Sequence, residues 1–238
     1  MPGLFRVLFR KELRCHFSSM AGFVFLAVFW AASGFYFSLT QLAAGNGDIK
    51  AFFTAFAPVL MFVLPLLTMR LYAEERNMRT EEMLLSAPVS LSSVILGKYA
   101  AAMAVFGIAL APSLAFPGIL AYLRAPDLLS AGGCYFGLAL TASAYISLGL
   151  FVSVCTESQT AAAAATYAVF LFMYLISPQG GMAPPGIAGR TAAFFSLSAR
   201  FTGFSYGIFN FADVFYYLSA SALFIFLSVF ALEDRRLA

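Results

Sequence analysis

Long apolar stretches without charged residues place the strongest constraint on how this chain can fold. A helix needs about 20 apolar residues to cross the hydrocarbon core of a bilayer, and the sequence contains six such windows. They cover residues 20–39, 52–72, 99–122, 132–154, 161–177 and 214–232. Charged residues make up 11% of the chain, against roughly 25% in a soluble domain. The sequence therefore predicts an all-α membrane protein with six transmembrane helices in one domain, residues 1–238.

The positions of the basic residues predict the orientation of these spans. If the N-terminus lies inside, the cytoplasmic set is Arg6, Arg10, Lys11, Arg14, Arg70, Arg76, Arg79, Lys98, Arg235 and Arg236. The external set is then only Lys50, Arg124, Arg190 and Arg200. This asymmetry is what the positive-inside rule requires, and the opposite orientation would invert it. We expect a multi-pass protein of the bacterial plasma (inner) membrane with both termini in the cytoplasm.

Residues 1–19 carry an amphipathic helical pattern. The basic side chains Arg6, Arg10, Lys11 and Arg14 fall on one arc of a helix. The opposite arc is apolar and contains Leu4, Phe5, Leu8, Phe9 and Leu13. Only Glu12 is out of place in this pattern. We expect a helix that lies on the inner membrane surface, with anionic membrane lipid as its partner.

The predicted cytoplasmic loop 73–97, between the second and third spans, is the most polar part of the chain. Its carboxylates are Glu74, Glu75, Glu81 and Glu82. An apolar turn, Met83-Leu84-Leu85, follows them shortly before Pro88. Since the residue before a proline disfavours the helical conformation, the pattern predicts a short helix that ends there. Such a helix would offer a partner protein a charged rim and an apolar anchor.

The predicted external segment 178–212, between the fifth and sixth spans, is rich in aromatic residues. It starts with proline and glycine and continues with Phe194, Phe195, Leu197, Phe201 and Phe204. Exposing so many aromatic side chains to water would be costly. We therefore expect a short interfacial or re-entrant helix in this segment.

Catalysis by this chain is not expected. Residues 74–79 match the E-E-x-x-x-R pattern of membrane-embedded prenyl-protein proteases, but those enzymes need further histidine motifs and His16 is the only histidine. Neither a phosphate-binding loop nor a G-x-S-x-G elbow occurs. Cys15, Cys134 and Cys155 are too far apart to suggest a metal site. We predict no catalytic residue, no metal site and no cofactor.

The charge distribution also argues against two further classes of function. A net charge of +3, spread in short clusters, does not form a nucleic-acid-binding face. The six predicted spans hold no Asp, Glu, Lys or Arg well inside the hydrocarbon, and this disfavours a proton- or sodium-coupled carrier. Energy for transport would have to come from outside the chain.

Three motifs follow one another around the polar loop. They are Leu67 to Glu75, Thr80 to Ser90, and Leu96-Gly97-Lys98. In order and spacing they resemble the ABC transporter permeases of the type-two exporter class, whose pattern is roughly M-x-x-x-x-E-E, G-T-x-E-x-L-L-x-x-P-V and L-G-K. One departure is Arg79, which stands where that family commonly has glycine.

Other segments extend this resemblance over nearly the whole chain. Arg10-Lys11-Glu12-Leu13 is similar to the N-terminal K-E-L segment of the family. Gly149 to Ser153, followed by Gln159, is similar to the G-L-x-x-S motif that leads into its fifth span. The C-terminal residues 209–236 resemble the gliding-motility-type permease subunits within the class.

The resemblance implies that the chain is the transmembrane permease subunit of an ABC transporter. Two such subunits, identical or related, would pair and form the translocation path, and each would dock a separate cytoplasmic ATPase that binds the ATP. The residues expected to couple to the ATPase are Glu74, Glu75, Thr80, Glu82, Leu84, Leu85 and Pro88. The alternative is a membrane scaffold or secretion-assembly component without transport of its own.

Overall fold

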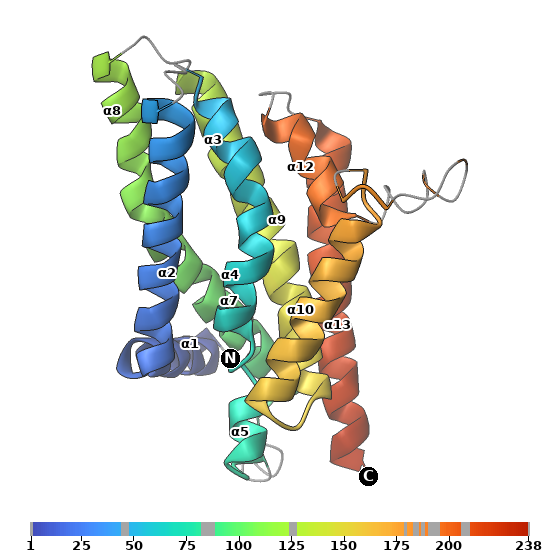
Figure 1. The fold of residues 1–238 in the computed structure, drawn as a ribbon. Helices are drawn as coiled ribbons and strands as arrows, with labels where there is room; N and C mark the ends of the chain where they lie inside the picture. The colour runs from blue at the N-terminus through green and yellow to red at the C-terminus, as the bar shows by residue number, and fades with distance from the viewer. Residues whose placement is uncertain are drawn as a thin grey trace.

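Helices form all the regular structure in the part of the chain that the computed structural model describes. That part comprises residues 2–43, 48–81, 89–123, 128–178, 180–182, 186, 189, 196–205 and 210–237. Five helical stretches, arranged as a bundle (Figure 1), are long and apolar enough to cross a membrane. They are Met20–Ala43, Ile49–Asn77, Leu91–Tyr122, Ser130–Cys155 and Phe211–Arg236. The all-α, multi-pass architecture expected from the sequence is therefore confirmed.

The remaining predicted span corresponds to a shorter helix. Helix α10 (Gln159–Leu175) is apolar and has 17 residues. At 1.5 Å per residue it extends about 25 Å, whereas the hydrocarbon core is about 30 Å thick. Helix α10 falls short of a span by length, so the count of six spans stays a prediction.

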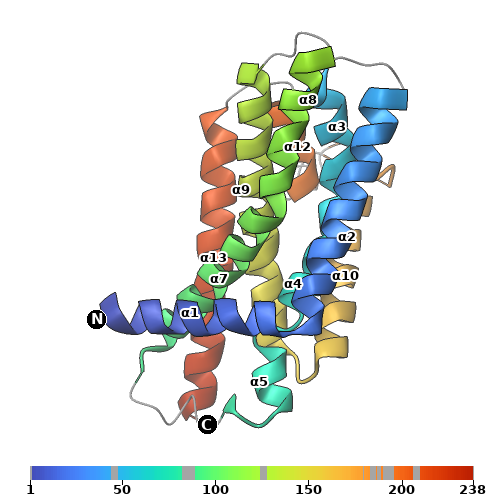
Figure 2. The ribbon, with the colours of Figure 1, turned by 90° about the vertical axis from the view of Figure 1, so that its left-hand side faces the viewer.

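Helix α1 (Pro2–Ser18) lies across the bundle rather than along it (Figure 2). It turns sharply into α2 (Met20–Phe37), where the amide of Gly22 donates to the hydroxyl of Ser19 at 3.3 Å. A Cβ atom on Gly22 would lie 2.0 Å from the carbonyl oxygen of His16, so this corner requires glycine. The segment predicted to be an interfacial helix is thus helical, and its contact with lipid stays a prediction.

Two spans are interrupted by tight 3-10 turns at prolines. Pro58 and Pro112 stand at the start of these turns, where the missing N–H donor of proline is tolerated. The segments are α3 (Ile49–Phe56), η2 (Ala57–Val59) and α4 (Leu60–Thr68) in one span, and α7 (Leu91–Leu110), η3 (Ala111–Leu114) and α8 (Ala115–Leu123) in the next. A π-helical turn, η1 (Ser38–Ala43), ends the first span.

Helix α7 begins at Leu91, earlier than the predicted start of the third span at residue 99. Leu91, Val94 and Ile95 are buried, so packing extends the helix towards α1. Lys98 consequently lies inside this helix and is 2% exposed. Lys98 stands near the start of this helix, so the expectation that no charge lies well inside the hydrocarbon stays a prediction.

Helix α9 (Leu128–Cys155) forms the centre of the bundle and packs against α4, α7, α10, α12 and α13. In its most apolar stretch 78% of the residues are buried, against 17% for α13 (Phe211–Leu237). A Cβ atom on Gly149 would lie 2.4 Å from the hydroxyl oxygen of Thr68 on α4. Glycine thus lets two spans approach closely, as small residues commonly do in membrane bundles.

Helix α12 (Leu197–Ser205) falls in the predicted external segment 178–212. Phe201 and Phe204 are 2% and 1% exposed, because α12 packs against α9. These rings are therefore covered by protein and need no membrane surface to leave water. Phe194 and Phe195 lie outside the described residues.

Candidate functional site

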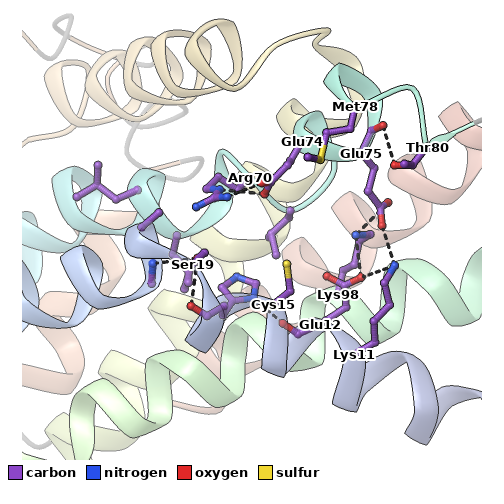
Figure 3. Close-up of a pocket in the computed structure, with 16 residues that line it drawn as sticks. Lys11, Glu12, Cys15, Ser19, Arg70, Glu74, Glu75, Met78, Thr80 and Lys98 are labelled. Carbon is purple, nitrogen blue, oxygen red and sulfur yellow. Dashed lines mark hydrogen bonds and ion pairs between the residues drawn. The ribbon is translucent and has the colours of Figure 1, made fainter.

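One end of the bundle brings together polar residues singled out from the sequence. Helix α1, helix α5 (Ala73–Asn77) and the last turns of α13 lie at this end (Figures 1 and 2). A cavity of about 360 Å³ lies between α1, α4, α5 and α7. Its walls include Glu12, Arg70, Glu75 and Lys98 (Figure 3). This cavity and helix α5 form the candidate site.

The start of helix α5 is fixed to the bundle by Ser153 of α9. The amides of Tyr72 and Ala73 donate to the Ser153 hydroxyl oxygen at 3.1 and 3.0 Å. The same hydroxyl lies 3.4 Å from the carbonyl oxygen of Met69, to which it donates. The first amides of a helix lack partners within it, and a side-chain oxygen that accepts from them stabilises the helix. Here the capping group comes from a neighbouring span, so α5 is tied to α9.

The end of helix α5 is closed by Arg79 in the left-handed conformation, with φ at 56°. The amide of Thr80 donates to the carbonyl of Glu75 at 2.9 Å, and the amide of Arg79 donates to that of Arg76 at 3.0 Å. This pair of bonds is the Schellman motif, which usually has glycine at the left-handed position. Arg79, which stands where the family commonly has glycine, is therefore the residue that must adopt the left-handed backbone conformation.

Lys98 lies at the centre of a group of four charges, of which Lys98 and Glu12 are buried, Glu75 is partly buried and Lys11 is exposed. Its ammonium nitrogen is 3.1 Å from Oε1 of Glu12 and 3.1 Å from Oε2 of Glu75. Lys11, on the more exposed side, is 3.3 Å from Oε1 of Glu75 and 3.8 Å from Oε1 of Glu12. We call these four residues the charge cluster (Figure 3). A buried ammonium without partners would be costly, so the charge cluster joins α1, α5 and α7.

Two titratable groups of α1 respond to this environment. Partial burial disfavours the charged form of Lys11, but the carboxylates of Glu75 and Glu12 outweigh it and raise the pKa of Lys11. Burial lowers the pKa of His16, so its imidazole is neutral at pH 7. The Nδ1 atom of His16 lies 2.9 Å from the carbonyl oxygen of Glu12. Because a carbonyl oxygen can only accept, Nδ1 carries the proton.

A second set of ion pairs connects α5 with α13 and with the turn after α9. Glu81 accepts a hydrogen bond from the Tyr72 hydroxyl at 2.9 Å. It also lies 3.7 Å from Arg76 and 3.6 Å from Arg235. Arg76 donates in addition to Glu157 at 2.8 Å. Contacts between three parts of the bundle therefore converge on the residues around α5.

The structure places the predicted coupling residues in different surroundings. Glu75 belongs to the charge cluster, and Glu74 accepts from Arg70 with an Nε–Oε2 distance of 2.9 Å. Thr80 is exposed, and its hydroxyl donates to the carbonyl of Glu75 at 3.0 Å. The predicted residues that lie outside the described part of the chain are Glu82, Leu84, Leu85 and Pro88. Contact of any of these residues with an ATPase stays a prediction.

The basic residues predicted on α1 are all exposed: Arg6, Arg10, Lys11 and Arg14. Glu12, the residue out of place in the amphipathic pattern, is 7% exposed because it faces Lys98. A single carboxylate on the apolar arc of an amphipathic helix is an indication that the side chain has a buried partner. No such indication exists for Ser153 in the sequence, apart from its place in the G-L-x-x-S motif.

Comparison with known families assigns the chain. The family model described as ABC-2 family transporter protein matches residues 31–199, which is more than half of the 238 residues. The chain belongs to the ABC-2 transporter family. No curated protein matches it.

An ABC-2 family protein is the membrane permease component of an ABC transporter and does not itself hydrolyse ATP. The family generally works with a partner ATPase and in a dimeric arrangement. The match spans from α2 to α12 and includes α5, Lys98 and Ser153. The candidate site thus lies within the matched range, except for the cavity residues contributed by α1 and by the start of α2.

Proposed function

We propose that this ABC-2 permease is the transmembrane subunit of an ATP-driven exporter, closest to the gliding-motility-type subunits. Two copies, or one copy and a related permease, form the translocation path as a dimer. Each copy docks a separate cytoplasmic ATPase, which binds all the ATP. The chain itself contributes no catalytic group, metal site or cofactor.

The anchoring of helix α5 carries this proposal. Ser153 holds its first turn to α9, and Glu75 joins it to Lys98 of α7 and to Glu12 of α1. The short helix α5 thus links the spans α7 and α9 with the surface helix α1. A displacement of α5 by an ATPase would move the elements packed on it, because close-packed interiors transmit strain. Rigid shifts of packed helices are a common form of such transitions.

The docking surface in this proposal consists of α5 and the residues that follow it. Leu84 and Leu85 supply the apolar anchor in a groove of the ATPase, and Thr80, Glu82 and Pro88 border it. Buried apolar anchors usually dominate such contacts, whereas charges at the rim contribute less. Glu75 has a different task here, because its carboxylate faces Lys98 and not the exterior.

The proposed topology has six spans, with α10 as the fifth, and both termini in the cytoplasm of a bacterial cell. Helix α10 is about 5 Å shorter than the hydrocarbon core, a mismatch that local thinning of the bilayer can accommodate. The candidate site then faces the cytoplasm. The exposed Arg6, Arg10, Lys11 and Arg14 meet the anionic lipid of the inner leaflet.

Reconstitution tests the proposed function. The chain is purified together with an ABC ATPase from the same organism, and ATP hydrolysis is measured in liposomes. We expect the complex to hydrolyse ATP, the chain alone to be inactive, and the ATPase alone to be slower than the complex. A chain that binds no ABC ATPase, or leaves its turnover unchanged, would support the non-transporting scaffold instead.

A further inference from the structure

A second cavity is lined in part by α12, a helix at the end of the bundle away from α1 and α5 (Figure 1). Its volume is about 210 Å³, and α3, η2, α9, α10 and α12 form its walls. The polar groups in these walls are hydroxyls, from Thr54, Thr141, Tyr145, Tyr174 and Ser198. None of the described residues that line it is charged. An ion would lose its hydration there without a countercharge, which is costly. The cavity therefore favours an uncharged polar ligand.

Among the residues that line the cavity, Tyr145 gives the main indication that a ligand binds there. It is 3% exposed, and its ring packs against Phe170 with a centroid distance of 4.5 Å. Its hydroxyl has no hydrogen-bond partner in the part of the chain that the structure describes. By contrast, Thr54 and Thr141 each donate to a carbonyl of their own helix at 2.9 Å. The hydroxyl is not among the fully buried polar atoms, so it is accessible from the cavity that Tyr145 lines. Because tyrosine hydroxyls inside a protein usually find a hydrogen-bond partner, the cavity is the place where that partner would bind.

The surroundings of the cavity favour a ligand that also has an apolar part. Tyr167 of α10 donates to the carbonyl of Phe62 on α4 at 2.7 Å, and Phe62 lies about one helical turn beyond Pro58 of the cavity wall. On either side of this contact Phe62, Leu171 and Phe172 are exposed. Leu171 and Phe172 stand on the last turns of α10, next to Tyr174 of the cavity wall. An alkyl chain that leaves the cavity here would meet apolar side chains and the bilayer.

We propose that this cavity binds the head of an uncharged, hydroxyl-bearing amphiphile. The Tyr145 hydroxyl bonds the polar head, the Tyr174 hydroxyl assists at the mouth, and the apolar chains lie along Phe62, Leu171 and Phe172. The site does not depend on ATP or on an ATPase. Its test is therefore separate from the test of the proposed function.

Native mass spectrometry of the purified chain tests this site. The probes are dioctanoylglycerol, which has an uncharged hydroxyl head, dioctanoyl phosphatidate, which has the same chains and a charged head, and glycerol, which has no chains. The variants are Tyr145→Phe and Tyr174→Phe, each of which removes one hydroxyl. Tyr122→Phe is the matched control, because Tyr122 is 92% exposed and is not one of the residues that line the cavity. Thermal unfolding of each variant shows whether the fold is intact.

We expect one dioctanoylglycerol adduct per chain, weakened about fivefold by Tyr145→Phe, as suits the loss of one hydrogen bond. Tyr174→Phe weakens it less, and Tyr122→Phe leaves it unchanged. Equal binding by Tyr145→Phe and Tyr122→Phe overturns the site. If phosphatidate binds as tightly as dioctanoylglycerol, the preference for an uncharged head is overturned. If glycerol binds as tightly as dioctanoylglycerol, the role of the apolar chains is overturned.

Discussion

The ammonium nitrogen of Lys98 lies 3.1 Å from the carboxylate of Glu12, although the two residues are 86 positions apart in the chain. Lys98 belongs to a span and Glu12 to the helix that crosses the end of the bundle. Glu75 of α5 shares the same ammonium group. One buried lysine thus connects the proposed lipid-facing helix with the proposed ATPase-facing helix.

Removing Lys98 should destabilise the protein strongly. Lys98→Ala leaves the buried carboxylate of Glu12 and the partly buried carboxylate of Glu75 with Lys11 as their remaining partner in the charge cluster. Breaking a buried ion pair in this way costs about 3–5 kcal/mol. Thermal unfolding in detergent measures the loss. Lys50→Ala is the control, because the side chain of Lys50 forms no ion pair within the described residues. Equal unfolding temperatures for the two variants would show that the charge cluster does not hold the helices together.

The lone histidine can report whether α1 is packed on the bundle. A Cβ atom on Gly97 would lie 3.3 Å from Cβ of Leu8, so Gly97→Leu should push α1 away. Burial lowers the pKa of His16, and its release should raise that pKa towards the ordinary value of 6.5. An NMR titration of protein without a histidine tag measures it. Gly107→Leu is the control, since nothing lies within 4 Å of that position; the same pKa in both variants would contradict the packing.

The lowered pKa of His16 also predicts how pH affects this packing. The packed state resists protonation of His16, whereas the unpacked or unfolded chain takes up the proton near pH 6.5. The stabilisation that neutral His16 gives to the packed state is therefore complete above pH 6.5 and declines as the pH falls below that value. Proteolysis of α1 at stepped pH should accelerate below pH 6.5, and a rate independent of pH would argue against burial of His16.

Replacing Arg79 by glycine should stabilise the end of helix α5. Glycine reaches the left-handed conformation without the steric cost that arginine bears, and a β-branched residue bears a larger cost. Arg79→Gly should stabilise the end of α5 by up to about 1 kcal/mol, and Arg79→Val should destabilise it. Hydrogen exchange of the amides of residues 78–80 compares the two. Equal exchange would mean that the left-handed turn is absent.

Ser153→Ala should loosen α5 without disturbing α9. It removes the hydroxyl that accepts from Tyr72 and Ala73, and losing a cap of this kind costs about 1–2 kcal/mol. Ser147→Ala is the matched control, because the hydroxyl of that buried serine donates to the carbonyl of Ala144 in its own helix at 2.9 Å and to no other described residue. Faster hydrogen exchange at residues 72–76 is expected for Ser153→Ala alone. Unchanged exchange there would contradict the cap.

The sequence was sufficient to predict the helical class and the approximate spans, because apolar length depends on local composition. The ends of the spans depend on packing, as α7 shows: Leu91, Val94 and Ile95 bury themselves and draw Lys98 into the helix. The partner of Lys98 could not be deduced, since periodicity identifies a misplaced Glu12 but not the element that it faces. The burial of Phe201 and Phe204 could likewise not be deduced, because it results from the packing of α12 against α9.

The central claim is that α5 and the segment after it connect an ATPase to the bundle, and two substitutions separate docking from transmission. Leu84→Asp should abolish copurification of the ATPase, because it places a charge in the proposed apolar anchor. Glu75→Gln should leave the ATPase bound, since this carboxylate faces Lys98, but should reduce the stimulation of ATP turnover by weakening the charge cluster. Both are compared with Arg190→Ala in the segment 178–212, measuring bound ATPase and ATP turnover together. The account predicts loss of the ATPase only for Leu84→Asp, and retention of the ATPase by that variant at the level of Arg190→Ala would contradict it.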